Sequence, residues 1–178
     1  VIVTSAFVMN VAGQACADAL ISSRSFGTVL RYDEVTDEFI DVFAPNLPMS
    51  GPKTALALGP EDNVYVSAIG NASVLRYHWP IEDFLGSFTL GGGLGDIIDI
   101  NFGLDDNFYV ASVSGVKKYD GTTGLFLGDF VNAEEGITYF AFGPNGDLYG
   151  SYPGDGATTD GVVKRYAAET GAFVEVSV

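Results

Sequence analysis

Residues 116–119 read VKKY, and a pattern that begins with valine and ends with a basic residue and a tyrosine occurs four times in the chain. The copies stand at 29–32 (VLRY), 74–77 (VLRY), 116–119 (VKKY) and 163–166 (VKRY). Their tyrosines are 45, 42 and 47 residues apart. So regular a spacing indicates a tandem structural repeat.

Two further sequence motifs recur at a fixed or nearly fixed distance from the tyrosines. A phenylalanine follows each tyrosine by seven residues, at Phe39, Phe84, Phe126 and Phe173. Upstream, residues 59–66 (GPEDNVYV), 103–110 (GLDDNFYV) and 143–150 (GPNGDLYG) match one another. The first copy lacks this turn, and Leu20 stands where the second copy has Tyr65. Clusters of Gly, Pro, Asp and Asn are turn chemistry, and the runs between them favour β-strand residues.

Each repeat therefore divides into four strands, which in the second copy are expected at about 54–58, 64–69, 74–78 and 84–90. No stretch keeps a helical period. A four-stranded meander repeated at this spacing is typical of a propeller blade. The sequence predicts a single all-β domain over 1–178, a β-propeller of four tandem four-stranded blades at about 1–45, 46–90, 91–132 and 133–178.

These motifs resemble a known family. The Gly-Pro-x-x-x-x-Tyr-Val turn, the Val-x-Arg-Tyr strand and the Thr-Gly-x-Phe turn are similar to NHL-repeat propellers and to the streptogramin-lyase-like (virginiamycin B lyase-like) propellers of bacteria, over about 18–178. The resemblance implies a ring of six or seven blades. Four blades leave three alternatives: a partial ring from a longer protein, which we favour, a closed ring of four, or subunits that complete a ring together.

The N-terminal residues 1–17 permit two interpretations. They are mostly apolar and uncharged and end in Ala-Cys-Ala at 15–17. This is the pattern of a signal-peptide remnant, or else the segment forms the first inner strand. We expect a secreted or periplasmic protein without membrane insertion. Cys16 is the one cysteine, so no intrachain disulfide can form.

Charge excludes several classes of function. The formal net charge is −15 with eight Lys plus Arg, so the chain lacks the basic surface that nucleic acid or an anionic membrane requires.

His78 is the one histidine. Lyases that resemble this family use channel histidines with a divalent metal. With no second histidine to match, no catalytic residue is carried over to this chain.

The candidate ligand-binding residues are Asp96, Asp99 and Asn101, on the expected inner strand of the third blade. Asp99 and Asn101 replace small residues of other copies, where a propeller faces its central channel. Their oxygens would suit Ca²⁺ or Mg²⁺. The alternative is a hydrogen-bonded polar strand that binds no ligand, and no other cofactor is expected.

The sequence indicates a broad class of function and no specific ligand or reaction. We expect an extracellular, non-enzymatic binding or structural module whose partner is a protein, a small molecule or a carbohydrate. One alternative is a metal-dependent lyase or hydrolase of the streptogramin-lyase type with its active site in blades outside this chain. The other is a structural subunit that self-associates through open blade faces.

Overall fold

The structure, a computed structural model, describes residues 3–8, 18–23, 28–44, 55–68, 72–79, 83–132, 136–154 and 161–177. Within these ranges every regular element is a β-strand, apart from the short 3₁₀ turn η1 (Pro60–Asp62). The predicted all-β class is therefore confirmed.

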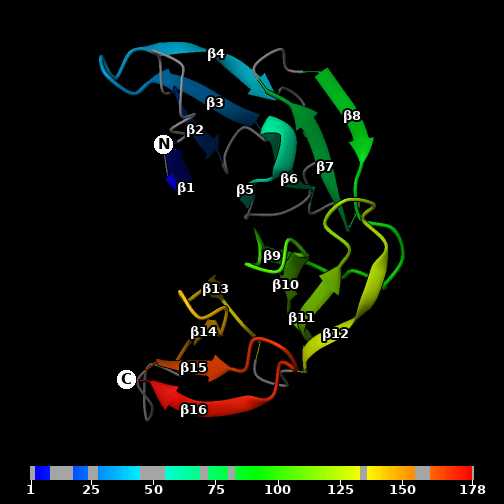
Figure 1. Ribbon diagram of the computed structural model, residues 1–178. Helices are drawn as coiled ribbons and strands as arrows, with labels where there is room; N and C mark the ends of the chain where they lie inside the picture. Colours follow the sequence, from blue (N-terminus) through cyan, green and yellow to red (C-terminus); the bar gives the residue numbers. More distant parts are fainter. Residues whose placement is uncertain are drawn as a thin grey trace. The chain divides into compact units, whose positions relative to one another are not determined.

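The strands form four antiparallel sheets, and in each sheet they lie side by side in chain order (Figure 1). Sheet 1 holds β1 (Val3–Val8), β2 (Asp18–Ser23), β3 (Thr28–Asp33) and β4 (Phe39–Ala44). Sheet 2 holds β5 (Leu56–Leu58), β6 (Asn63–Ala68), β7 (Ser73–His78) and β8 (Asp83–Ser87). Sheet 3 holds β9 (Ile97–Phe102), β10 (Phe108–Ser112), β11 (Gly115–Tyr119) and β12 (Phe126–Asn132). Sheet 4 holds β13 (Tyr139–Phe142), β14 (Leu148–Tyr152), β15 (Val162–Tyr166) and β16 (Phe173–Ser177).

The repeated tyrosine and the phenylalanine seven residues later form a ring contact in every sheet. The tyrosine ends the third strand and the phenylalanine begins the fourth, so the two side chains meet across the turn. The pairs and their centroid distances are Tyr32–Phe39 at 5.6 Å, Tyr77–Phe84 at 5.3 Å, Tyr119–Phe126 at 5.5 Å and Tyr166–Phe173 at 6.0 Å. The constant seven-residue offset thus has a packing cause.

The strand register confirms the alignment of the copies. Tyr65, Tyr109 and Tyr149 each lie opposite the basic residue of the third strand, and Leu20 lies opposite Arg31 in the same way. Leu20 therefore occupies the tyrosine position of sheet 1, as predicted.

One predicted strand end is wrong. The outer strand expected at 84–90 stops at Ser87. Leu90 instead pairs with the beginning of the outer strand of sheet 3: its N–H donates to the carbonyl of Gly124, and its carbonyl accepts from the N–H of Phe126. The chain leaves sheet 2 early because these hydrogen bonds tie it to sheet 3.

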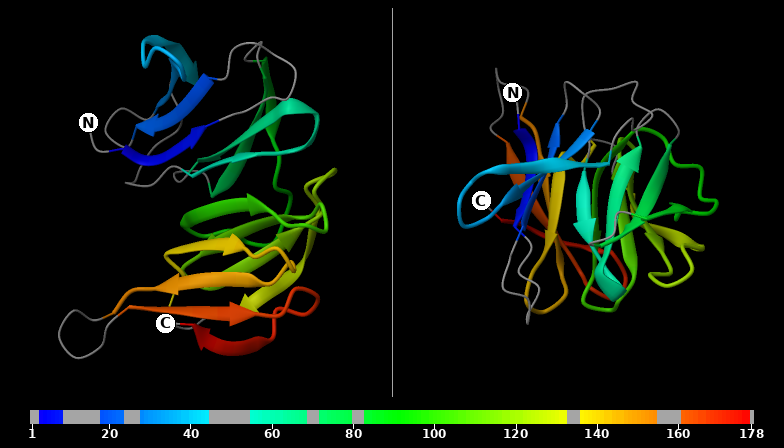
Figure 2. Two further views of the ribbon diagram at one scale, coloured as in Figure 1. Left: turned by 60° about the vertical axis from the view of Figure 1, so that its left-hand side comes forward. Right: turned by 90° about the horizontal axis from the view of Figure 1, so that it is seen from above.

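The chain divides into two compact units, Val1–Gly86 and Ser87–Val178. Sheets 3 and 4 belong to the second unit; the strands of sheet 4 run from yellow to red in Figure 2. Sheets 1 and 2 belong to the first unit, except that Ser87 of β8 falls in the second.

Each sheet has two faces, which we name by the third strand. The front face carries its valine and basic residue, and the back face carries its tyrosine. In the first unit Leu20 and Val29 on the front of sheet 1 share a core with Val64, Val66 and other residues on the back of sheet 2. In the second unit the front of sheet 3 packs in the same way on the back of sheet 4. The residues of that second core are Tyr109, Ala111, Val116, Phe130, Val131, Ile137, Phe140, Leu148, Tyr152 and Tyr166.

Candidate functional site

The predicted ligand residues lie at the beginning of β9 and along it. Asp96 immediately precedes the strand and is exposed, whereas Asp99 and Asn101 alternate on its front face. One oxygen of Asp99 accepts from the N–H of Ile100 at 3.0 Å, and the oxygen of Asn101 accepts from the N–H of Phe102 at 2.9 Å. These two side chains are thus engaged by backbone of their own strand.

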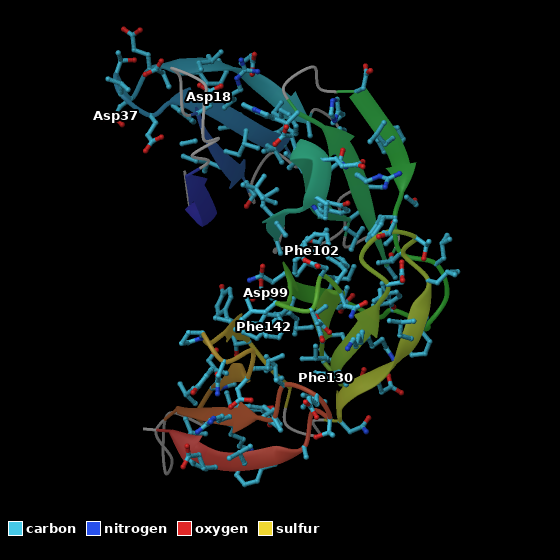
Figure 3. All side chains as sticks on the ribbon, viewed as in Figure 1. Asp18, Asp37, Asp99, Phe102, Phe130 and Phe142 are labelled. Carbon is cyan, nitrogen blue, oxygen red and sulfur yellow. The ribbon has the colours of Figure 1, made fainter. Side chains whose placement is uncertain are left out.

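Asp99 also links two sheets. Its second oxygen accepts from the N–H of Phe140 on β13, at 3.0 Å, so the inner strands of sheets 3 and 4 are joined through this carboxylate (Figure 3). Burial raises the pKa of Asp99 to about 6, although both backbone hydrogen bonds act in the opposite direction. A ligand role for Asp96, Asp99 and Asn101 remains a prediction, since both oxygens of Asp99 already have backbone donors.

Within the described ranges, no group of three or more His, Cys, Asp and Glu side chains is arranged to hold a metal ion. His78, at the end of β7, has its Nδ1 3.4 Å from the side-chain oxygen of Asn63, and Cys16 lies outside the described ranges. Nor does the described part of the chain include a helix long and apolar enough to cross a membrane.

A pocket of about 410 Å³ opens between sheets 3 and 4, at the end where their turns lie. It is bounded by the β9–β10 and β13–β14 turns and by the β15–β16 turn. The residues that line it are Leu104, Asp105, Tyr109, Lys118, Phe142, Asn145, Gly146, Ala168 and Glu169. Its volume falls in the range of small-molecule sites.

A three-residue network occupies one wall of the pocket. Lys118 of β11 is 2.7 Å from a carboxylate oxygen of Asp105, and the Tyr109 hydroxyl donates to the same oxygen at 3.0 Å. The Lys118 ammonium also lies 5.5 Å from the centroid of the Tyr109 ring. Because Tyr109 and Lys118 are cross-strand neighbours on one face, the sheet itself sets this geometry.

The network holds its charges fixed around neutral pH. Burial raises the pKa of Asp105, but hydrogen bonds from Lys118 and its neighbours outweigh this and hold the pKa at about 2. Burial lowers the pKa of Lys118, but its bonds to Asp105 and Tyr109 outweigh burial and raise it. Burial raises the pKa of Tyr109 to about 12. None of the three therefore exchanges a proton near pH 7, which suits binding better than acid–base catalysis.

The rest of the pocket combines apolar surface with one free carboxylate. Phe142 packs edge-on against Tyr109 at 4.8 Å and forms an apolar wall with Leu104, which is 66% exposed. Glu169, on the β15–β16 turn, is exposed and has no ion-pair or hydrogen-bond partner among the residues that the structure describes.

Sequence reasoning missed this pocket, although a signal was present. The basic residue before each tyrosine recurs in all four copies, and in the described part of the chain it forms ion pairs in at least three of the sheets. Arg31 pairs with Asp18 at 3.1 Å and Arg165 with Asp147 at 2.6 Å. These two carboxylates stand two residues before Leu20 and Tyr149, whereas Asp105 stands four residues before Tyr109. The Lys118–Asp105 pair lines the pocket.

Comparison with known proteins gives the fold and no closer relationship. By sequence, no protein-family model and no curated protein matches the chain. Similar solved structures include Kuenenia stuttgartiensis hydrazine synthase, with a TM-score of 0.70 and 18% identity over 90% of this chain and 46% of that one. The computationally designed Ika8 protein has a TM-score of 0.63 and 18% identity over 90% and 46%.

A third similar structure is the extracellular domain of a hybrid two-component system from B. thetaiotaomicron, with a TM-score of 0.63 and 15% identity over 89% of this chain and 20% of that one. The chain thus spans less than half the length of each of these three structures. At these identities the likeness concerns the fold alone, and the predicted β-propeller fold is confirmed.

Proposed function

We propose that this chain is a non-enzymatic binding module, part of a secreted propeller related to the NHL-repeat and streptogramin-lyase-like families, and that its ligand enters the pocket between sheets 3 and 4. The observation that carries the proposal is the Asp105–Tyr109–Lys118 network, whose groups neutralise one another and keep fixed charges near pH 7. These three side chains can contact a ligand through polar groups, and none of them changes its protonation state near pH 7. The family motifs and the extracellular domain among the similar structures support the secreted assignment.

The ligand class follows from charge and size. Lys118 is neutralised by Asp105, so Glu169 is the free charge at the pocket, in a chain whose net charge is −15. A negative field attracts cations and raises their local concentration. The apolar wall of Leu104 and Phe142 would contact the body of the ligand. We infer a small organic cation of about monosaccharide size.

The test uses two probes that differ by one group, glucosamine and glucose, titrated into ¹⁵N-labelled protein. We expect glucosamine to shift the amide signals of the three turns that bound the pocket, and more strongly than glucose. Glu169→Gln should weaken glucosamine binding at least about tenfold, which corresponds to about 1.4 kcal/mol. Added salt should weaken it as well.

The matched control is Glu34→Gln, which makes the same change of charge on the exposed β3–β4 turn, outside the pocket. This variant should bind glucosamine as the unchanged chain does. Equal effects of the two substitutions, or signal shifts that avoid the pocket turns, would contradict the proposal.

A further inference from the structure

The two units stack their sheets in the same way, so equivalent positions in them can be compared directly. In the first unit the front of sheet 1 packs on the back of sheet 2, and in the second unit the front of sheet 3 packs on the back of sheet 4. The repeated tyrosine aligns them, because Tyr77 of sheet 2 corresponds to Tyr166 of sheet 4. Two residues further along the chain, Trp79 therefore corresponds to Ala168.

Backbone hydrogen bonds support the equivalence of these two positions. The N–H of Trp79 donates to the carbonyl of Asp62 at 2.9 Å, and the N–H of Ala168 donates to a carboxylate oxygen of Asp147 at 2.8 Å. Asp62 and Asp147 lie in corresponding turns, between the first and second strands of sheets 2 and 4. Both residues are thus held to the turn that precedes the second strand of their own sheet.

In the first unit the indole of Trp79 fills the space at this end of the two sheets. Its ring lies 5.5 Å from that of Phe43, and the guanidinium carbon of Arg31 lies 5.0 Å from its centroid. Trp79 is 6% exposed and belongs to the core of the unit. The indole therefore has an aromatic ring and a cation as neighbours, and both neighbours belong to sheet 1.

The second unit has the same two neighbours and lacks the indole. Phe130 corresponds to Phe43 and Lys118 to Arg31, and the Lys118 ammonium lies 5.9 Å from the centroid of the Phe130 ring. The side chain opposite them is only the methyl group of Ala168. Ala168 and Lys118 both line the pocket of about 410 Å³. The pocket therefore opens at the place that the indole fills in the first unit.

Other rings line the rest of this pocket. Tyr109 and Phe142 replace two leucines of the first unit, and their rings are 4.8 Å apart. Tyr109 also packs at 5.0 Å against Phe130 and so takes over one contact of the absent indole. A planar aromatic group that enters the pocket would meet these rings, and aromatic pairs are more favourable than their buried area alone predicts.

The charge beside this place selects a cationic ligand. Glu169 follows Ala168 directly in the chain, lines the pocket and is exposed. A ring in the position of the indole would therefore lie close to the Glu169 carboxylate. An ammonium group joined to that ring by a short chain can reach the carboxylate while the ring stays in the pocket.

We propose that the ligand of the pocket between sheets 3 and 4 is an arylalkylamine, whose ring takes the place of the Trp79 indole and whose ammonium group pairs with Glu169. The inference rests on the proposed function and narrows its organic cation to an aromatic one. Lys118 then lies near the ring as Arg31 lies near the indole, and its ion pair with Asp105 limits its repulsion of the ligand's ammonium group.

The test titrates tryptamine and n-hexylamine, which has the same charge and no ring, into ¹⁵N-labelled protein. We expect both amines to shift the amide signals of the three turns that bound the pocket, and tryptamine to bind at least about tenfold more tightly. Nuclear Overhauser effects should connect the indole protons of tryptamine with the Ala168 methyl group. Indole-3-acetate, which has the ring and the opposite charge, should bind more weakly than tryptamine.

The outcomes separate this inference from the proposed function. Equal affinities of tryptamine and n-hexylamine, with shifts at the pocket turns, would overturn the aromatic ligand and leave a binding site for organic cations. If neither these amines nor glucosamine shifts the pocket turns, the proposed function is wrong and the inference is wrong with it.

Ala168→Trp tests the position of the ring, because it gives the second unit the residue that the first unit has. It should fill the pocket and weaken tryptamine binding at least about tenfold. Ala172→Trp makes the same change at an exposed position of the same turn, outside the pocket lining, and should leave binding unchanged. If Ala168→Trp does not fold, Ala168→Leu replaces it and should also weaken binding. Unchanged binding by the folded variant would overturn the proposal.

Discussion

The Asp99 carboxylate accepts hydrogen bonds from backbone N–H groups of its own sheet and of the neighbouring sheet. The counterpart positions in sheets 2 and 4 are Ala55 and Tyr139, and there the amide at this position donates to a serine hydroxyl of the next strand, Ser67 or Ser151. In sheet 3 the serine position is Ala111, and Asp99 receives two backbone donors, one of them from sheet 4. The substitution thus replaces a bond within a sheet by one between sheets.

The raised pKa of Asp99 predicts a pH dependence of stability. The pKa is about 6 in the folded chain against 3.8 for the free group, so the folded state binds the proton more tightly. The contribution of Asp99 to the free energy of unfolding is therefore greatest below pH 4 and falls as the pH rises to about 6. Asp99→Asn cannot titrate, and it loses one acceptor at a cost of about 1 kcal/mol.

The measurement is urea unfolding of the unchanged chain and of Asp99→Asn between pH 4 and pH 7. The stability advantage of the unchanged chain should shrink from pH 4 through pH 6 and level off only near pH 7. Asp96→Asn makes the same chemical change at an exposed position outside the β9–β13 hydrogen bond and serves as the control for the substitution itself. An advantage that grows with pH would show that Asp99 is stabilised in its ionised form.

At the scale of the strand and turn, the sequence predicted most features that recur in the four copies. It missed features that occur in one copy alone. The tyrosine–phenylalanine offset, the register through Leu20 and the four strands per repeat follow from local patterns that recur four times. The end of β8 and the pocket network depend on contacts between residues far apart in sequence. Asp105 and Lys118 are 13 positions apart, and only the sheet brings them together. A single copy of a pattern gives no statistical signal, so the pocket could not be distinguished from ordinary turn charge.

The turn before each outer strand supplies an element-scale prediction. Gly124 has φ +72°, and a Cβ there would lie 1.9 Å from the carbonyl oxygen of Phe88. Gly93 also has a positive φ, +57°, but a Cβ would have nothing within 4 Å. Gly93→Ala should cost about 1–2 kcal/mol from backbone strain alone. Gly124→Ala should cost more than about 3 kcal/mol, because the clash with a strand carbonyl adds to the strain.

Thermal and urea unfolding of the two alanine variants measure this difference. Gly171 repeats the geometry in sheet 4, with a Cβ 1.9 Å from the carbonyl oxygen of Phe130, so Gly171→Ala should behave as Gly124→Ala does. Equal costs at Gly93 and Gly124 would mean that the close approach to the preceding outer strand is not maintained in solution.

At the scale of the whole molecule, we expect each of the two units to have its own free energy of unfolding. Each unit has its own core cluster, built from the front of one sheet and the back of the next. In repeat architectures stability is approximately a sum of unit and nearest-neighbour terms, so a defect acts close to where it is made. The outer-strand phenylalanines Phe43 and Phe130 are equivalent positions in the two cores and provide a matched pair.

Phe130→Ala removes a ring that lies 5.0 Å from that of Tyr109, and Phe43→Ala removes one that lies 5.5 Å from that of Trp79. Each should cost about 3–5 kcal/mol in its own core. Native-state hydrogen exchange should therefore show amides of Ser87–Val178 losing protection in Phe130→Ala, and amides of Val1–Gly86 in Phe43→Ala. If either variant lowers protection equally along the chain, the two units unfold together as one cooperative structure, and the expectation of separate stabilities is wrong.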